Sequence, residues 1–321
     1  MRIPNRLSSG LLAGSALAAL LFAQTPAARA ADKIRVGQAA QAFSFAVPEI
    51  GTEAGIFQRL GVDCEKIEFS GAAKENQGLI ANAADVGLTG STDFAFEVKG
   101  APHRTVAAIV VYPVNMALSV VNAIKSPDDL KGKRIGVTQS GTLTYWMALE
   151  FARTKGWGKD GVIPVPVGGV LANQVAALVT GQVEAVMSDA AVGLTLAQQG
   201  RGRLLMTAQD FVPNFAANSI IAHTDFIRDH PDVLKRFLKG WFESVTWLLA
   251  HKEESVKIGM KVTGLSKPVM DAEYDEQRQM WSRDGRFSQQ QLDQLARAIT
   301  EIGLVEQKPD LTKFYDPSFL P

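Results

Sequence analysis

Cysteine is almost absent from this sequence, and histidine is sparse. The 321 residues include one cysteine, Cys64, which excludes an intramolecular disulfide and a thiolate zinc site. The four histidines are scattered, and no two of them have the i,i+4 spacing of a helical metal site. We therefore expect no bound metal and no other cofactor, and we assign Cys64 a packing role in a strand.

An excess of either charge is also lacking, since the chain has 33 basic and 33 acidic residues. A near-neutral chain has no basic field to attract a nucleic acid, so we expect no partner of that kind. The sequence contains neither a Gly-x-Ser-x-Gly elbow nor the phosphate-binding loop of nucleotide hydrolases. We therefore expect a protein that is not an enzyme. After residue 30, no segment has the length and apolarity of a membrane span.

The first 30 residues are organised like a secretory signal peptide. Arg2 and Arg6 precede an apolar run over residues 11–23, and residues 28–30 form a small-x-small pattern. The run is about 13 residues long, whereas a helix that spans a bilayer needs ~20. We therefore expect cleavage before Ala31 rather than a membrane anchor, which would leave the mature chain free in a periplasmic space.

The remaining chain alternates short β-type runs with longer helical ones, which is typical of mostly parallel sheets covered by helices. The strands expected in a first unit lie at residues 33–37, 62–69, 84–88 and 106–111. Those expected in a second unit lie at residues 133–137, 162–167, 183–187 and 203–206. From residue 224 onward the pattern is helical, and we assign the apolar stripe over residues 233–249 to the core.

Two extended apolar stretches, residues 116–121 and 218–222, lie where the chain would pass between these units. Two connections permit hinge bending while they prevent free tumbling. The predicted organisation is a signal peptide (1–30), a first lobe in two parts (31–117 and 222–321) and a second lobe (118–221).

An ordered set of short stretches resembles a known family. The stretches are residues 51–57 with 61–62, residues 82–87, residues 126–137, residues 140–142, residues 180–187 with Asp189, and residues 230–237. In their order and spacing they resemble the type II periplasmic binding proteins of the nitrate/sulfonate/taurine class, the SsuA/THI5-like (NMT1) family. The resemblance implies an α/β fold of two Rossmann-like lobes joined by a two-strand hinge. It also implies a substrate-binding protein of an ABC transporter, whose partner is a permease complex in the inner membrane.

Ligands of open parallel sheets bind outside the carboxyl ends of the strands. In the loops at those ends, glycines allow backbone N–H groups to approach a ligand, and serine and threonine hydroxyls donate hydrogen bonds. A helix N-terminus adds partial positive charge, so such a loop can hold a sulfonate, carboxylate or phosphate without Lys or Arg. Helix capping is the competing role of the same hydroxyls. The ligand-binding residues we expect are Gln41, Phe43, Ser44, Gly90, Ser91, Thr92, Tyr112, Ser140, Gly141, Thr142, Asp189 and Asn214.

Several of these residues have alternative roles. Asp189 can accept hydrogen bonds from an amine or a ring N–H, or it can cap the helix that follows it. Phe43, Tyr112 and Phe215 can sandwich a flat ligand, and packing in the core is the competing role of each ring. Asn214 can contact ligand or satisfy the backbone of a turn.

The leading interpretation is a periplasmic protein that binds a small organic anion (a sulfonate, taurine or nitrate) by lobe closure. The first alternative is a flat heterocycle or aromatic acid, of the thiamine-pyrimidine type. The second is an enzyme on the same fold, but the thiamine-pyrimidine synthase that resembles this family carries a cysteine-rich segment, from which a chain with Cys64 alone departs. Neither the ligand nor a sensing role is distinguished by the sequence, and a monomer is the natural form for a shuttle.

Overall fold

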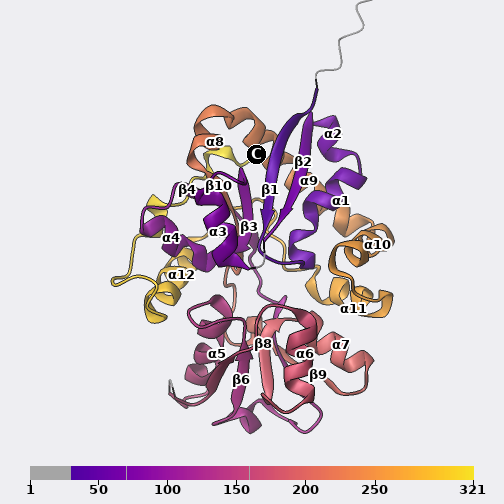
Figure 1. The fold of residues 1–321 in the computed structure, drawn as a ribbon, viewed down its shortest axis with the longest axis vertical. Coiled ribbons are helices and arrows are strands. Elements are labelled where there is room, and N and C mark those ends of the chain that lie inside the picture. The colour runs from indigo at the N-terminus through magenta and orange to yellow at the C-terminus, as the bar shows by residue number, and fades with distance from the viewer. Residues whose placement is uncertain (1–29, 70, 159) are drawn as a thin grey trace, which may run out of the picture. The chain divides into compact units, whose positions relative to one another are not determined.

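Two five-stranded β-sheets organise the protein (Figure 1). The computed structural model describes residues 30–69, 71–158 and 160–321, so the predicted signal segment lies outside the described residues apart from Ala30. The first sheet has the strand order β2–β1–β3–β10–β4, and the second has the order β7–β6–β8–β5–β9. The strands of the first sheet are β1 (Asp32–Gln38), β2 (Val62–Glu68), β3 (Val86–Gly90), β4 (His103–Val110) and β10 (Asn218–His223). Those of the second are β5 (Met116–Val121), β6 (Arg134–Val137), β7 (Ile163–Pro166), β8 (Ala185–Asp189) and β9 (Gly202–Thr207). We call each sheet, with the helices that cover it, the first lobe and the second lobe.

Each sheet contains one strand that runs against the other four. In the first, β1 pairs in parallel with β2 and β3, while β10 is antiparallel to both β3 and β4. In the second, β6 pairs in parallel with β7 and β8, while β5 is antiparallel to both β8 and β9. All the strands predicted at 33–206 are present with ends within a few residues. The stretches predicted as connections, residues 116–121 and 218–222, are instead inner strands of the sheets.

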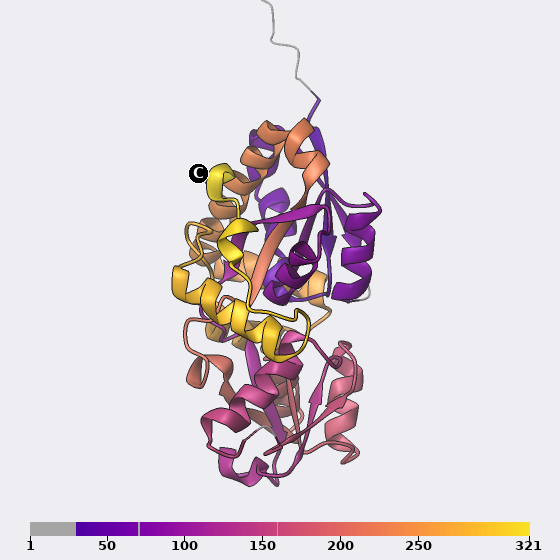
Figure 2. The ribbon, with the colours of Figure 1, turned by 90° about the vertical axis from the view of Figure 1, so that its left-hand side faces the viewer.

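The chain passes twice between the sheets, at residues 111–115 and 208–217, which we call the crossing segments. The predicted lobe boundaries at 117/118 and 221/222 fall inside β5 and β10, close to these segments. The bounds of the moving lobes stay a prediction. Segments from the start and end of the chain lie side by side in both Figure 1 and Figure 2, where indigo ribbon adjoins orange and yellow.

Helices cover the sheets. The α-helices are α1 (Val47–Glu53), α2 (Ile56–Arg59), α3 (Ala72–Ile80), α4 (Phe94–Val98), α5 (Leu143–Thr154), α6 (Leu171–Val179), α7 (Ala191–Gln198), α8 (Thr224–Asp229), α9 (Pro231–Ala250), α10 (Lys252–Thr263), α11 (Lys267–Gln277) and α12 (Gln289–Glu301). The 3₁₀ helices are η1 (Phe43–Phe45), η2 (Ser91–Asp93), η3 (Pro127–Leu130), η4 (Ala208–Asp210), η5 (Leu311–Lys313) and η6 (Pro317–Phe319). Of the helices in the described ranges, none has both the length and the apolarity that crossing a membrane requires.

The longest helix, α9, shows how the sequence determines the packing. It begins at Pro231, whose fixed φ suits the first helical position. Phe237, Trp241, Val245 and Leu248 recur at helical spacing and are at most 1 % exposed, which confirms the predicted core stripe.

Helix α1 packs against α9 through a close approach at Gly51. A Cβ atom at Gly51 would lie 2.1 Å from Ser244 Oγ and 2.5 Å from the ring of Phe57. Since interior side chains are already close-packed, neither neighbour has free space to move into. Glycine is therefore required at this contact.

We expect Gly51→Ala to lower the free energy of unfolding by about 2 kcal/mol. Overpacking costs about 3 kcal/mol at its upper end, and replacing a helical glycine by alanine gains at most about 1 kcal/mol. The matched control is Gly169→Ala, whose added Cβ would have its nearest contact at 4.0 Å, with Thr138 Cγ2. Urea unfolding of both variants checks this, and equal midpoints would contradict the packing argument.

Candidate functional site

The carboxyl ends of strands in both sheets lie beside the crossing segments. Gly90, the last residue of β3, pairs with Asn218, where the chain has just returned to the first sheet. Asp189, the last residue of β8, pairs with Met116, where the chain has just entered the second sheet. The loops selected by the carboxyl-end rule therefore start next to the two connections between the lobes.

Hydrogen bonds tie these loops to the crossing segments. The Ser91 amide donates to the Ala217 carbonyl oxygen at 2.9 Å, and the Ala190 amide donates to the Asn115 carbonyl oxygen at 2.8 Å. The crossing segments are joined in turn, because Asn115 Nδ2 donates to Asn218 Oδ1 at 3.1 Å. One chain of backbone and side-chain hydrogen bonds thus runs from the first-lobe loop to the second-lobe loop.

The first-lobe loop contains a hydroxyl without a partner. Ser91 is fully buried, and its Oγ has no hydrogen-bond partner within the described ranges. Thr92 is 6 % exposed and Gly90 is partly exposed. A buried hydroxyl without a partner is costly, so this site favours an acceptor that the protein does not supply.

A buried carboxylate supports this loop from behind. Asp93 Oδ2 accepts hydrogen bonds from Thr89 Oγ1 and Asn76 Nδ2, both at 2.5 Å. Burial raises the pKa of Asp93 to about 6, although these hydrogen bonds oppose the rise. Burial and the nearby Asp93 also raise the pKa of Glu75 well above its ordinary value. Asp93 therefore anchors Thr89, near the end of β3, through a hydrogen bond. Because the carboxyl group is buried, its ionised form carries a free-energy cost.

The second-lobe loop is more open. Ser140 is exposed, and Gly141 has the positive φ of 73° that favours glycine. Thr142 directly precedes α5, but its hydroxyl donates to the Gln139 carbonyl oxygen at 2.8 Å, and no side-chain capping bond is formed. The predicted capping role of Thr142 is therefore not realised in this loop, and the Ser140 side chain lies at the surface.

Asp189 has the helix-capping role that was the alternative to ligand contact. Its Oδ1 accepts the Ala191 amide at 2.9 Å, which caps α7. Burial raises the pKa of Asp189 to about 6.

The other predicted residues are dispersed. Gln41 is exposed and donates to Glu68 Oε2 at 3.0 Å, and Asn214 is exposed in the left-handed region with φ 59°. Tyr112 is 45 % exposed on the first crossing segment. Ser44 is buried next to Phe43.

The other predicted aromatic rings lie in the core. Phe43 is fully buried, with its ring centroid 6.2 Å from that of Tyr274 and 6.0 Å from that of Trp281. Phe215 is also fully buried and stacks on Trp146 at 5.1 Å. Both rings have the packing role that was the alternative to ligand contact.

Two features of the site escaped the sequence reasoning. One is the amide pair Asn115 and Asn218, whose members are 103 residues apart. The other is Glu273, which shares a buried helix face with Met270 and Gln277. Two polar residues four positions apart, Glu273 and Gln277, on a buried helix face were a signal that could have identified Glu273.

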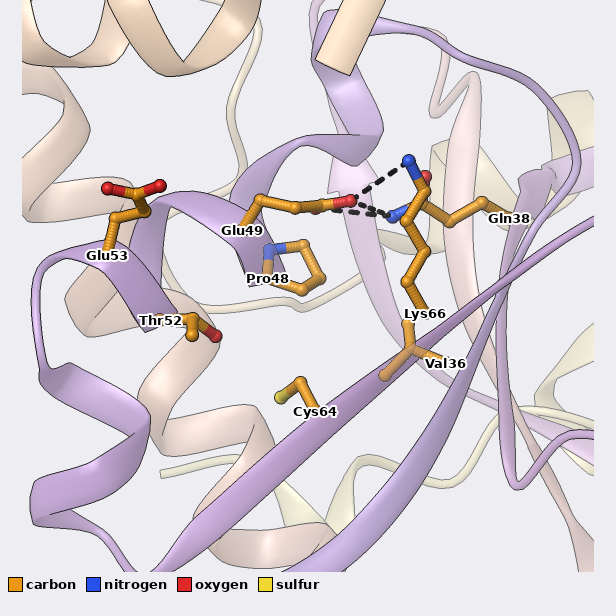
Figure 3. A pocket seen from close by; sticks show the side chains of 8 residues that line it. All are labelled: Val36, Gln38, Pro48, Glu49, Thr52, Glu53, Cys64 and Lys66. Carbon is orange, nitrogen blue, oxygen red and sulfur yellow. Dashed lines mark hydrogen bonds and ion pairs between the residues drawn. The ribbon is translucent and has the colours of Figure 1, made fainter. Parts of the chain in front are cut away.

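A small cavity lies elsewhere in the first lobe, between α1 and strands β1 and β2 (Figure 3). Its volume is about 190 Å³, and its lining residues are Val36, Gln38, Pro48, Glu49, Thr52, Glu53, Cys64 and Lys66. Glu49 accepts hydrogen bonds from Gln38 Nε2 at 3.1 Å and pairs with Lys66 Nζ at 3.2 Å, as the dashed lines show. Burial raises the pKa of the Cys64 thiol, so this sulfur is a poor nucleophile. None of the predicted ligand residues lines this cavity.

A metal site is not found in the part of the chain that the structure describes. There, no group of three or more His, Cys, Asp and Glu side chains is placed to hold a metal ion.

We expect Asn218→Ala to lower the free energy of unfolding by about 1–3 kcal/mol, because it leaves the buried Asn115 Nδ2 without an acceptor. The matched control is Asn122→Ala, which removes an exposed amide that donates to the Gly200 carbonyl oxygen at 2.8 Å. Urea unfolding should show a loss within about 0.5 kcal/mol for the control. Equal losses of unfolding free energy in the two variants would show that the buried amide pair stabilises the fold no more than an exposed amide does.

Asp93 predicts a pH-dependent stability difference. An acid whose folded pKa is raised from 3.8 to about 6 stabilises the fold below pH 3.8, and this contribution is lost as the pH rises through 6. We therefore expect Asp93→Asn to gain stability relative to the parent protein between pH 4.5 and 7.5, by at most about 3 kcal/mol. Denaturant unfolding of the variant and the parent protein at pH 4.5 and at pH 7.5 measures this gain. The control is Asp63→Asn, which changes an exposed aspartate. A difference that does not change with pH would contradict the burial cost.

Comparison with known proteins agrees with this architecture. Residues 45–255 match the NMT1/THI5-like family. A protein of Brucella abortus (strain 2308) that bears the name "Putative binding protein" is 25 % identical over 265 residues, which cover 81 % of each chain. The alkanesulfonate-binding protein SsuA from Xanthomonas axonopodis pv. citri, bound to MOPS, superposes with a TM-score of 0.74 at 17 % identity, covering 88 % of this chain and 98 % of that one. The periplasmic nitrate-binding protein NrtA from Synechocystis PCC 6803 gives a TM-score of 0.71 at 15 % identity, with coverages of 89 % and 86 %.

These likenesses confirm the predicted fold class, two α/β lobes of the type II periplasmic binding protein kind. The match to residues 45–255 spans more than half of the chain. The protein belongs to the NMT1/THI5-like family.

Proposed function

We propose that the protein is a periplasmic solute-binding protein that captures a small organic anion between its lobes for an ABC importer. Three facts support the general role: membership of the family, the two-lobe fold, and similarity to an alkanesulfonate-binding and a nitrate-binding protein. The cleaved signal peptide predicted over residues 1–30 accounts for the periplasmic location. The permease partner follows from the family.

The Ser91 hydroxyl is the observation that carries the choice of an anion. It is buried, has no acceptor within the described ranges, and lies in a loop hydrogen-bonded to a crossing segment. An oxyanion oxygen is a strong acceptor for such a donor, because hydrogen bonds to charged groups are the stronger ones. Ser140, which is exposed, and Gly141, which is partly buried, precede the 12-residue helix α5 and provide a hydroxyl and a helix N-terminus from the second lobe.

Binding to both loops couples capture to lobe closure. A ligand that touches Ser91 in one lobe and Ser140 in the other makes its full set of contacts only when the lobes approach. It therefore shifts the population toward the closed form by its differential affinity for that form. An affinity near micromolar requires about 8 kcal/mol, which several hydrogen bonds and one buried face provide.

A flat aromatic ligand is the second candidate, and Tyr112 favours it. Its ring is 45 % exposed on the first crossing segment, next to the strand ends. An exposed ring at that place offers a stacking face for a heterocycle or an aromatic acid.

The test is thermal melting of residues 31–321 with butanesulfonate, taurine, nitrate, benzoate and an aminopyrimidine. We expect one of the first three compounds, at 100 times its Kd, to stabilise the fold by about 2.7 kcal/mol, which raises Tm by several degrees. Ser91→Ala and Ser140→Ala should each weaken that ligand about tenfold or more, because each removes a hydrogen bond to an anion.

The matched control is Thr154→Ala, which removes an exposed hydroxyl at the opposite end of α5 and should leave the affinity unchanged. A shift with benzoate or the aminopyrimidine alone, weakened by Tyr112→Ala, would support the aromatic ligand instead. No shift with any compound contradicts both proposals.

A further inference from the structure

A buried carboxylate closes the first-lobe loop around Ser91. Asp93 is 4 % exposed, and its Oδ2 accepts hydrogen bonds from Thr89 Oγ1 and Asn76 Nδ2, both at 2.5 Å. The first of these bonds joins residues 89 and 93, and Ser91 is the middle residue of that stretch. A ligand held by the Ser91 hydroxyl therefore lies close to the Asp93 carboxylate.

The charges around Asp93 do not neutralise it. The loops over residues 89–93 and 139–143 contain no lysine or arginine. His103, which is 1 % exposed, lies 3.5 Å from Glu97 through Nδ1, so it faces a carboxylate of its own. Glu75 of α3 is fully buried and adds a further acid near Asp93.

The cations on the surrounding elements are engaged elsewhere. Helices α4 and α12 both pack on η2, and Arg297 of α12 pairs with Glu150 at 2.7 Å. Lys74 of α3 is exposed, and Arg104 of β4 donates to the Lys313 carbonyl oxygen at 3.2 Å. The sequences of β3 and η2 contain no ionisable side chain besides Asp93. Those of α3, α4, β4 and α12 contain Lys74, Glu75, Glu97, His103, Arg104, Asp293, Arg297 and Glu301.

A carboxylate without a cation repels an anion that binds beside it. Two unit charges about 10 Å apart, at an effective dielectric constant of about 20, repel each other enough to raise a Kd about tenfold. A doubly charged ligand at the same place meets twice the repulsion, which raises its Kd about a hundredfold. A repulsive group of this kind discriminates between ligands as effectively as an attractive contact does.

We propose that Asp93 makes the site selective for singly charged oxyanions, because its carboxylate repels a second negative charge at Ser91. The inference rests on the proposed function, since it concerns the anion that the Ser91 hydroxyl holds. It narrows the ligands to sulfonates, carboxylates and nitrate, and excludes dianions such as sulfate and ionised phosphonates. Asp93 has this effect through its charge, without contacting the ligand.

The ionised form of Asp93 is the one that selects. Burial raises the pKa of Asp93 to about 6, so the group is charged at pH 7.5 and above. A bound anion raises this pKa further, because a nearby like charge disfavours the ionised form. Anion binding is therefore linked to proton uptake, and the affinity for a sulfonate rises as the pH falls through 6.

The test compares butanesulfonate with butylphosphonate by isothermal titration calorimetry at pH 9, where the first carries one charge and the second carries two. The variant is Asp93→Asn. Both hydrogen bonds of Asp93 end on Oδ2, so the amide oxygen of asparagine accepts both. We expect the variant to bind the sulfonate about tenfold and the phosphonate about a hundredfold more tightly, so that the ratio of the two Kd values falls about tenfold.

The matched control is Asp63→Asn, which removes an exposed carboxylate of the same lobe. We expect this variant to keep the Kd ratio of the parent protein. Urea unfolding shows that each variant is folded.

Proton uptake is a second readout, which a purely structural role of Asp93 would not change. It is measured at pH 6 for butanesulfonate, by calorimetry in two buffers of different ionisation enthalpy. We expect the parent protein to take up about 0.4 proton more than Asp93→Asn, as a rise of one pKa unit from about 6 requires. Asp189, whose pKa is also about 6, is present in both proteins and cancels from the difference.

The outcomes separate this inference from the proposed function. A fall in the Kd ratio together with reduced proton uptake, both in Asp93→Asn and neither in Asp63→Asn, would support the selectivity. An unchanged ratio, or equal proton uptake by the parent and Asp93→Asn, would overturn it. Binding of neither compound to Asp93→Asn would overturn it too, because removal of the carboxylate favours both. The proposed function fails only if no anion of the melting panel binds the parent protein.

Discussion

The amide hydrogen bond between Asn115 and Asn218 joins the two segments through which the chain passes between its sheets. Each asparagine lies where a crossing segment leads into a strand: Asn115 directly precedes β5, and Asn218 begins β10. Because both amides are buried, each must find a partner inside the protein. The bond therefore sets where the two connections can lie relative to each other. The strand ends that pair with these connections inherit that constraint.

The arrangement of the candidate site follows from this constraint. Ser91 is held by Ala217 and Ala190 is held by Asn115, so each loop is one hydrogen bond away from the paired connections. If the lobes close about these connections as proposed, loops attached beside them would shift less than the outer ends of the lobes, so a ligand would meet both loops with little rearrangement of either. The buried Ser91 hydroxyl lacks an acceptor within the described ranges, and the proposed ligand would relieve part of that cost.

Much of the fold was predictable because its signals are local. The strands of both sheets and the stripe along α9 follow periods of 2 and 3.6, and these depend only on near neighbours in sequence. The runs over β5 and β10 were predicted as connections, because continuous apolar residues suit a connection as well as a strand buried on both faces. Both strands run antiparallel to their neighbours because the chain enters each of them from the other lobe. No local pattern in the sequence encodes that direction.

The site was less predictable for the same reason. Serine and threonine after a strand indicate a loop, but only the packed structure separates the buried Ser91 from the exposed Ser140. Phe43 is placed by contacts with Tyr274 and Trp281, more than 200 residues later, and its core role could not be chosen over ligand stacking from its neighbours.

Two acids show how strand ends accommodate a carboxyl group away from water. Burial raises the pKa of both Asp93 and Asp189 to about 6. Hydrogen bonds from Thr89 and Asn76 oppose that rise at Asp93, whose partners all belong to its own lobe, so its titration affects the stability of that lobe. The Ala191 amide at the start of α7 opposes the rise at Asp189 in the same way. The end of a strand thus supplies some of the donors that a carboxylate loses when it leaves water.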